Sequence, residues 1–240
     1  MDRLLICLLL LISTNAYSLN LTAKSWLVTD EHGIVLASEN PDKVRTIASI
    51  TKLLTSIVVL ESNVNLDDKV DTDAFGSISR RELMTMAMVR SNNTAADLLC
   101  RTYPSGYKSC ISNMNSKLQT LGMGKSKVYD STGLDRRNVS TANELILLVQ
   151  EAEKHPELID ITQNSAIEIK IKHKWFVFKN TNPLIGNTHN IQVSKTGWTR
   201  KAGGCIVMSM NTDKGKRIVV VLGSKSPRTR IPEAEFISQI

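Results

Sequence analysis

The sequence predicts an α/β (α+β) fold, with an antiparallel sheet flanked by helices and a second lobe made of helices. Strand-like runs occur at both ends of the chain, within residues 25–38 and 167–222. Between them, about residues 65–160, apolar residues recur mainly at helical spacing. One sheet built from both ends of the chain would hold the helical block as a lobe. The cleft at their junction would be a favoured place for a ligand.

The first residues have the pattern of a secretory signal. Arg3 supplies a positive charge, residues 4–12 are apolar, and Ala16-Tyr17-Ser18 matches a small-x-small cleavage site. The apolar run is shorter than the ~20 residues that span a bilayer. We therefore expect a signal peptide over 1–18 and a single domain over 19–240. The protein should be exported to the periplasm or the exterior, with no transmembrane anchor after signal removal.

The amino-acid composition and net charge indicate which classes of binding partner to expect. The chain has 240 residues, of which 42% are hydrophobic and 22% charged, as in an ordinary soluble globular protein. Its net charge of +7 favours polyanionic surroundings such as an acidic cell-wall polymer, an anionic membrane or nucleic acid. Aromatic residues make up only 5%, and no dense basic run is interleaved with them. A nucleic-acid partner is therefore not expected.

Local patterns place the elements in order. Two strands, 25–29 and 33–38, should form a hairpin, and a helix should begin near Ser49. A polar connection follows at 65–70. Further helices are expected at 79–88, 94–101, 108–121 and 141–155. The later strands are expected at 167–171, 175–178, 191–195, 204–210 and 217–222.

Four cysteines differ in their setting. Cys7 lies in the signal segment, whereas Cys100 and Cys110 flank a short turn. An exported protein can oxidise such a pair, but the sequence does not supply the bridging geometry, so a disulfide and two free thiols both remain open. Cys205 lies in an apolar run and is expected to be a buried, inert thiol.

Ser49-Ile50-Thr51-Lys52 is the first candidate for chemistry. If Ser49 opens a helix, Lys52 lies on the same face, so an amine stands beside a hydroxyl. A desolvated lysine can remove the proton of a serine and make it nucleophilic. The alternative is an ordinary helix N-cap with a solvated lysine. Ser105 and Lys108 have the same spacing, so the tetrad alone does not decide.

Two further motifs follow in a distinctive order. Ser91-Asn92-Asn93 lies in a break between two expected helices, and Lys195-Thr196-Gly197 closes an expected strand. Ser-x-Asn is common by chance, but Lys-Thr-Gly occurs once. The ordered trio is typical of class A β-lactamases and penicillin-binding proteins.

With these motifs, the chain resembles the serine D-Ala-D-Ala carboxypeptidases, the low-molecular-mass penicillin-binding proteins. The resemblance extends from about Lys24 to Arg230 and includes five further runs, at 45–48, 131–135, 180–184, 202–205 and 221–223. The chain departs from the family pattern at Ile47, where a proline is usual, and at Trp198. It also stops near the end of the catalytic domain, where longer relatives carry an amphipathic helix.

The resemblance implies a role for each motif residue. Ser49 would attack the carbonyl of the penultimate D-Ala, and Lys52 would be its base. Ser91 would relay a proton to the leaving amine, and Asn93 would hydrogen-bond the peptide and Lys52. The backbone N–H groups of Ser49 and Trp198 would form the oxyanion hole.

Substrate binding is implied for a second set of residues. Lys195 would supply positive charge for a C-terminal carboxylate, and Thr196 a hydroxyl. Gly197 would let the substrate backbone approach the strand edge. Arg230 matches a family arginine near the carboxylate, although a plain surface arginine beside Arg228 is an equal alternative.

The function expected from this resemblance is a serine D,D-carboxypeptidase acting on peptidoglycan stem peptides, with β-lactam antibiotics as covalent inhibitors. A D,D-endopeptidase of peptide cross-links would use the same residues. A β-lactamase would need a glutamate that positions water. Glu144, Glu151 and Glu153 lie in the right interval but on an expected helix. A catalytically silent wall-binding module is the last alternative.

No metal or cofactor is expected. The four histidines show no metal-ligand spacing, and no glycine-rich phosphate loop occurs; the histidines are residues 32, 155, 173 and 189.

Overall fold

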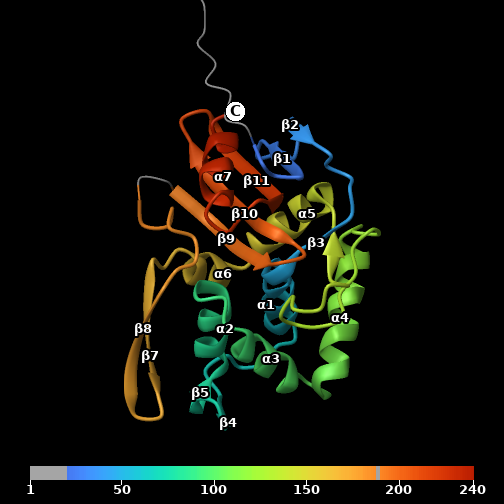
Figure 1. The fold of residues 1–240 in the computed structure, drawn as a ribbon. Coiled ribbons are helices and arrows are strands. Elements are labelled where there is room, and N and C mark those ends of the chain that lie inside the picture. Colours follow the sequence, from blue (N-terminus) through green and yellow to red (C-terminus); the bar gives the residue numbers. More distant parts are fainter. Residues whose placement is uncertain (1–20, 188–189) are drawn as a thin grey trace, which may run out of the picture.

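The computed structural model describes residues 21–187 and 190–240, which form a five-stranded sheet with helices on both faces and a helical lobe beneath it (Figure 1). The expected signal peptide lies outside the described residues, so cleavage after Ser18 stays a prediction. Within those residues, no helix is both long enough and apolar enough to cross a membrane.

The central sheet unites the two ends of the chain. Its strand order is β2-β1-β11-β10-β9, and all neighbours are antiparallel. The strands are β1 (Ser25–Thr29), β2 (Val35–Glu39), β9 (Asn190–Thr199), β10 (Gly203–Thr212) and β11 (Gly215–Ser224). Strand β1 pairs with β11, which confirms a sheet built from both termini. Strand β9 is an edge strand.

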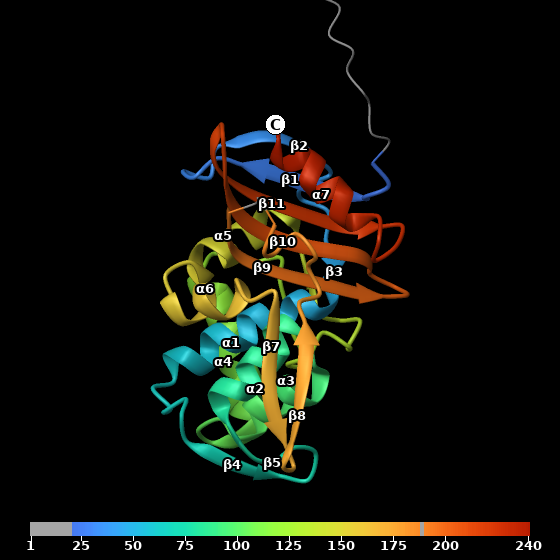
Figure 2. The same ribbon diagram turned by 90° about the vertical axis from the view of Figure 1, so that its left-hand side faces the viewer.

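Both faces of the sheet are covered, which explains the continuous apolar runs in its strands. Successive residues point to opposite faces. Val219 and Val221 belong to a cluster with Ala234 and Ile237 of helix α7 (Arg230–Ser238). Val220 instead joins the larger core of the helical lobe. Figure 2 shows α7 on one side of the sheet and helices α5 (Ala142–Ala152) and α6 (Pro156–Thr162) on the other.

Helix α1 (Thr51–Glu61) lies at the centre of the helical lobe, and every residue from Thr51 to Val59 is buried. It contacts all the other long helices, namely α2 (Arg80–Val89), α3 (Asn93–Arg101), α4 (Gly106–Thr120) and α5. The expected capping box opens α2, because Ser79 and Glu82 each bond the backbone N–H of the other. The disulfide Cys100–Cys110 joins α3 to α4.

Several expectations need correction. The polar connection at 65–70 leads into a hairpin of β4 (Lys69–Thr72) and β5 (Gly76–Ser79). Strands β7 (Ala166–Ile171) and β8 (Lys174–Lys179) form a separate hairpin instead of joining the main sheet (Figure 1). Ile167 and Ile169 are buried, and β7 contacts α2, so this hairpin is held by the lobe.

Helices α6 and α7 were not expected, because both are short and their apolar spacing is weak. Two short strands, β3 (Arg45–Thr46) and β6 (Val139–Ser140), pair beside the sheet.

Cys205 is fully buried in β10, as expected for an inert thiol. Burial raises its pKa to about 11, so the thiolate is scarce at neutral pH.

Candidate active site

Ser49 lies in a single 3₁₀ turn, Ala48–Ile50, immediately before α1. The N-cap alternative does not hold, because neither this turn nor α1 has a side-chain cap hydrogen bond. Ala48 has a φ of +47°, a left-handed conformation that costs an L-residue free energy. The backbone is therefore strained at Ala48, the residue just before the candidate nucleophile Ser49.

The amine of Lys52 points at the hydroxyl of Ser49. Its Nζ lies 2.9 Å from Ser49 Oγ and donates to Asn93 Oδ1 at 2.7 Å and to the Thr132 carbonyl oxygen at 2.6 Å. Lys52 is fully buried. Burial lowers its pKa to about 7, and the negative charge of Asp130 opposes this only in part. A neutral amine is therefore accessible near neutral pH.

The loop that supplies the Thr132 carbonyl is organised by one carboxylate. Asp130 accepts from the Thr132 hydroxyl and the Asn138 amide. It also accepts from three backbone N–H groups, those of Gly133, Leu134 and Asp135. Asn138 in turn donates to the Thr51 hydroxyl at the start of α1. Neither Asp130 nor Asn138 was singled out from the sequence. An aspartate and an asparagine are common in turns, and the sequence does not show which groups they hydrogen-bond.

Gly133 lets this loop touch the nucleophile segment. Its φ is +84°, and a Cβ built on it would lie 1.9 Å from the Ala48 carbonyl oxygen. No other residue fits such an approach without moving the backbone that leads to Ser49.

Lys195 forms a second amine–hydroxyl pair. Its Nζ donates to Ser91 Oγ and to the Thr196 carbonyl oxygen, both at 2.9 Å. Burial first, and then the positive charges of Lys52 and Arg230, lower its pKa well below the usual value for lysine. Ser91 has a φ of +60° in the break between α2 and α3.

Asn92 explains why its two neighbours face the site. Its side chain accepts from the Ala95 N–H and caps α3. This capping ties the middle residue of the motif to the helix. Its neighbours Ser91 and Asn93 bond instead to Lys195 and Lys52.

The edge strand β9 passes directly beside Ser49. A Cβ on Gly197 would lie 2.9 Å from the Ser49 backbone nitrogen. Arg230 donates through Nη1 to the Gly197 carbonyl oxygen at 2.7 Å and is only 6% exposed. The alternative of a plain surface arginine is therefore wrong. Thr196 donates to the hydroxyl of Thr181, a residue not singled out from the sequence. Trp198 is half exposed.

The structure thus brings all three motifs together between the sheet edge and the helical lobe. The three glutamates considered for a β-lactamase are engaged elsewhere. Glu144 bonds to Ser126, Glu151 to Lys117 and Lys154, and Glu153 to Lys216. Within the described part of the chain, none of these hydrogen bonds reaches the Ser49–Lys52 pair.

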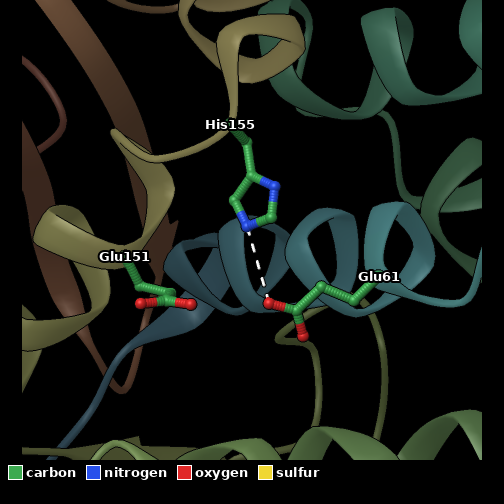
Figure 3. A group of neighbouring side chains, drawn as sticks. All are labelled: Glu61, Glu151 and His155. Atoms are coloured by element: carbon green, nitrogen blue, oxygen red, sulfur yellow. Dashed lines mark ion pairs between the residues drawn. The ribbon is translucent and has the colours of Figure 1, made fainter.

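A separate group, Glu61, Glu151 and His155, lies where α1, α5 and the start of α6 meet (Figure 3). Its ligand atoms are close enough to hold a metal ion. However, Lys117 Nζ from α4 lies 2.5 Å from Glu61 and 2.7 Å from Glu151. The lysine ammonium forms ion pairs with both carboxylates, so a metal cation would have to displace it. The arrangement is an ion-pair network between helices.

Comparison with known proteins agrees with this geometry. The D-alanyl-D-alanine carboxypeptidase family, peptidase S11, matches residues 12–226. A D-alanyl-D-alanine endopeptidase of Pseudomonas aeruginosa is 37% identical, over 89% of this chain and 75% of its own length. One of Escherichia coli is 34% identical, over 83% of this chain and 70% of its own.

Solved structures agree on the fold. Penicillin-binding protein D2 of Listeria monocytogenes, in a cefotaxime-bound form, superposes with a TM-score of 0.83 and 28% identity, covering 92% of this chain and 97% of that one. The Streptomyces K15 DD-transpeptidase superposes with a TM-score of 0.84 and 26% identity, covering 91% and 96%. The chain therefore belongs to the D-alanyl-D-alanine carboxypeptidase family and is a serine DD-peptidase of the S11 type.

Proposed function

We propose that this protein hydrolyses D-alanyl peptide bonds of peptidoglycan through an acyl-enzyme on Ser49. The observation that carries the proposal is the 2.9 Å contact between the buried Lys52 amine and the Ser49 hydroxyl. A lysine with a pKa of about 7 is in part neutral at physiological pH and is suited to general-base catalysis.

In the acylation step, Lys52 takes the proton of Ser49 as its oxygen forms a bond to the D-Ala carbonyl carbon. The carbon–nitrogen bond then breaks, and the proton that Lys52 took would pass through Ser91 to the leaving amine, so that Lys52 is neutral again. Ser91 is held for this relay by Lys195, whose Nζ lies 2.9 Å from its hydroxyl. Water next attacks the ester, with Lys52 again as the base, and releases the acyl product and free Ser49.

The developing oxyanion would be held by the backbone N–H groups of Ser49 and Trp198. The close approach of Gly197 to the Ser49 nitrogen supports this role, because it brings the segment that carries Trp198 beside Ser49. Each such donor is worth roughly 3 kcal/mol in the transition state.

The substrate peptide would extend along β9, whose outer edge has no strand partner among residues 21–187 and 190–240. Its terminal carboxylate would lie near Lys195, Thr196 and Arg230. A carboxylate beside the buried Lys195 would favour the charged form of that amine, whose pKa burial otherwise lowers.

We favour endopeptidase action on peptide cross-links over the carboxypeptidase action expected from the sequence. Support comes from three relatives that are 32–37% identical to this chain, all of which are named D-alanyl-D-alanine endopeptidases. Carboxypeptidase action is the second candidate, because relatives with that name match at 24–29% identity. Cleavage of a cross-linked muropeptide dimer, compared with release of D-Ala from a pentapeptide, decides between them.

β-Lactams should acylate the same serine. Support comes from the Listeria relative, whose structures contain bound cefotaxime and ampicillin. A fluorescent penicillin should label the protein stably, and Ser49→Ala should abolish labelling. Ser105→Ala is the matched control, because Ser105 and Lys108 share the motif spacing but are exposed. Labelling that persists in Ser49→Ala contradicts the proposal, and rapid turnover of the drug points to a β-lactamase.

Export also belongs to this proposal. A substrate in the cell wall requires it, and the Cys100–Cys110 disulfide supports an oxidising compartment. Fractionation of cells should recover the oxidised protein outside the cytoplasm.

A further inference from the structure

A cavity outside the candidate active site lies at the ends of strands β1, β10 and β11. Its volume is about 450 Å³, within the range of small-molecule sites. The lining comes from five segments: Lys24, Val44–Thr46, Val139, Arg200–Gly203 and Gly223–Lys225. We call it the basic pocket.

The basic pocket is strongly positive. Five of its lining residues are cationic, namely Lys24, Arg45, Arg200, Lys201 and Lys225, and none is acidic. Within the described part of the chain, no ion pair joins any of these five to a carboxylate. Uncompensated like charges around one cavity repel each other, and an anion placed among them relieves that repulsion.

Two of these cations are held in position. The Arg45 guanidinium donates through Nε to the buried Ser25 hydroxyl at 2.7 Å and through Nη2 to the Lys24 carbonyl oxygen at 3.0 Å. Its remaining Nη1 donors have no partner among the described residues, so they are available to an oxyanion. The side chain of Lys24 lies against Gly223, where a Cβ would come within 3.0 Å of it. The glycine makes room for the lysine.

The basic pocket adjoins the substrate edge. Arg200 and Lys201 follow β9 directly, three and four residues beyond Gly197, which corresponds to about 10 Å of extended chain. Thr46, which also lines the basic pocket, lies three residues before Ser49 in the sequence. A peptide paired with β9 would reach this cavity after about three further residues.

We propose that the basic pocket binds a carboxylate of the extended peptide substrate, so that this protein prefers cross-linked, carboxylate-rich peptides to short neutral ones. The inference rests on the proposed function, since it takes a peptide along β9 as the substrate. A cross-linked dimer carries the acidic groups of two stem peptides, whereas a short blocked peptide carries one terminal carboxylate.

The test measures binding without cleavage, in the full chain carrying Ser49→Ala. The two ligands are a cross-linked muropeptide dimer with free carboxylates and the same dimer with its stem carboxylates amidated. Calorimetric titration of the double variant Arg200→Gln/Lys201→Gln should give a Kd for the free dimer that is about three- to tenfold weaker, because two exposed charge contacts are lost. The Kd of the amidated dimer should stay unchanged.

A second double variant, Lys170→Gln/Lys172→Gln, is the matched control. It removes the same charge from the β7–β8 hairpin and should leave both Kd values unchanged. High salt should remove the preference for the free dimer only where Arg200 and Lys201 are present.

Three results would overturn the proposal: equal weakening in both double variants, equal affinity for the free and amidated dimers, or no measurable binding of either. The proposal would also be wrong if inorganic phosphate bound in the basic pocket without displacing the dimer. The basic pocket would then be a site for free phosphate. A failure of the proposed function is detected separately, by penicillin labelling and hydrolysis in the protein that retains Ser49.

Discussion

The amine of the buried Lys52 lies 2.9 Å from the Ser49 hydroxyl and also donates to Asn93 Oδ1 and the Thr132 carbonyl oxygen. Burial lowers the pKa of Lys52 to about 7. Only the neutral amine can accept the serine proton, so acylation should be slow below pH 7, rise through that value and level off above it. Stopped-flow acylation by a penicillin across pH 5–10 measures this profile.

Lys52→Arg is the control for this profile. It keeps the positive charge but provides no base, so acylation should be lost at every pH. A wild-type midpoint near the ordinary lysine pKa, or a Lys52→Arg variant with normal acylation, would show that another group is the base.

Gly133→Ala should cost both stability and acylation. The new Cβ would lie 1.9 Å from the Ala48 carbonyl oxygen and would displace the segment that carries Ser49. We expect a loss of about 3 kcal/mol or more in the free energy of unfolding, measured with urea. Penicillin acylation of the folded fraction should slow as well.

Gly122→Ala separates the effect of the steric contact with Ala48 from the effect of a left-handed backbone. Gly122 has a similar φ of +77° but no atom within 4 Å of its Cβ position. It should therefore lose only the ~1 kcal/mol of left-handed strain and keep full acylation. Equal losses of unfolding free energy in the two alanine variants would mean that backbone strain, and not the contact with Ala48, accounts for the effect of Gly133→Ala.

Lys117→Met should destabilise the helical lobe by about 2–3 kcal/mol, because Glu61 and the buried Glu151 lose their shared partner. Lys154→Met removes a largely exposed partner of the same Glu151 and should cost less than 1 kcal/mol. Urea unfolding at pH 7 compares them. Similar costs for the two variants would contradict a central role for Lys117.

The cost of Lys117→Met should depend on pH in a defined direction. Burial alone would raise the pKa of Glu151, but hydrogen bonds from Lys117 and Lys154 bring it below 4.5. The stabilisation is therefore present above pH 4.5 and is lost as pH falls through the lowered value. The gap between wild type and Lys117→Met should shrink as the pH of the unfolding experiment is lowered toward 3.

Removal of the Cys100–Cys110 disulfide should cost about 2–3 kcal/mol, because it closes a loop with a sequence separation of 10. Cys100→Ala/Cys110→Ala should unfold at a lower urea concentration than the oxidised protein. A thiol reductant should move the wild-type midpoint in the same direction and leave the double variant unchanged. An unchanged wild-type midpoint after full reduction would contradict this prediction.

Local spacing was sufficient for much of the architecture and for part of the site. Alternating and helical periodicity predicted the strands of the main sheet and the long helices. A separation of three residues on one helical turn predicted that the amine of Lys52 would meet Ser49. The capping box at Ser79 could be read in the same way, since its partners are three residues apart.

The contacts that complete the site join residues far apart in the chain, and these only the tertiary structure decided. Lys195 meets Ser91, Gly133 touches Ala48, and Lys117 joins Glu61 to Glu151 because the packing of the sheet and the helices brings their backbones together. The sequence by itself determined which reactive groups the chain carries. Their burial, and with it the lowered pKa of Lys52, depends on what surrounds them in space, which spacing along the chain does not specify.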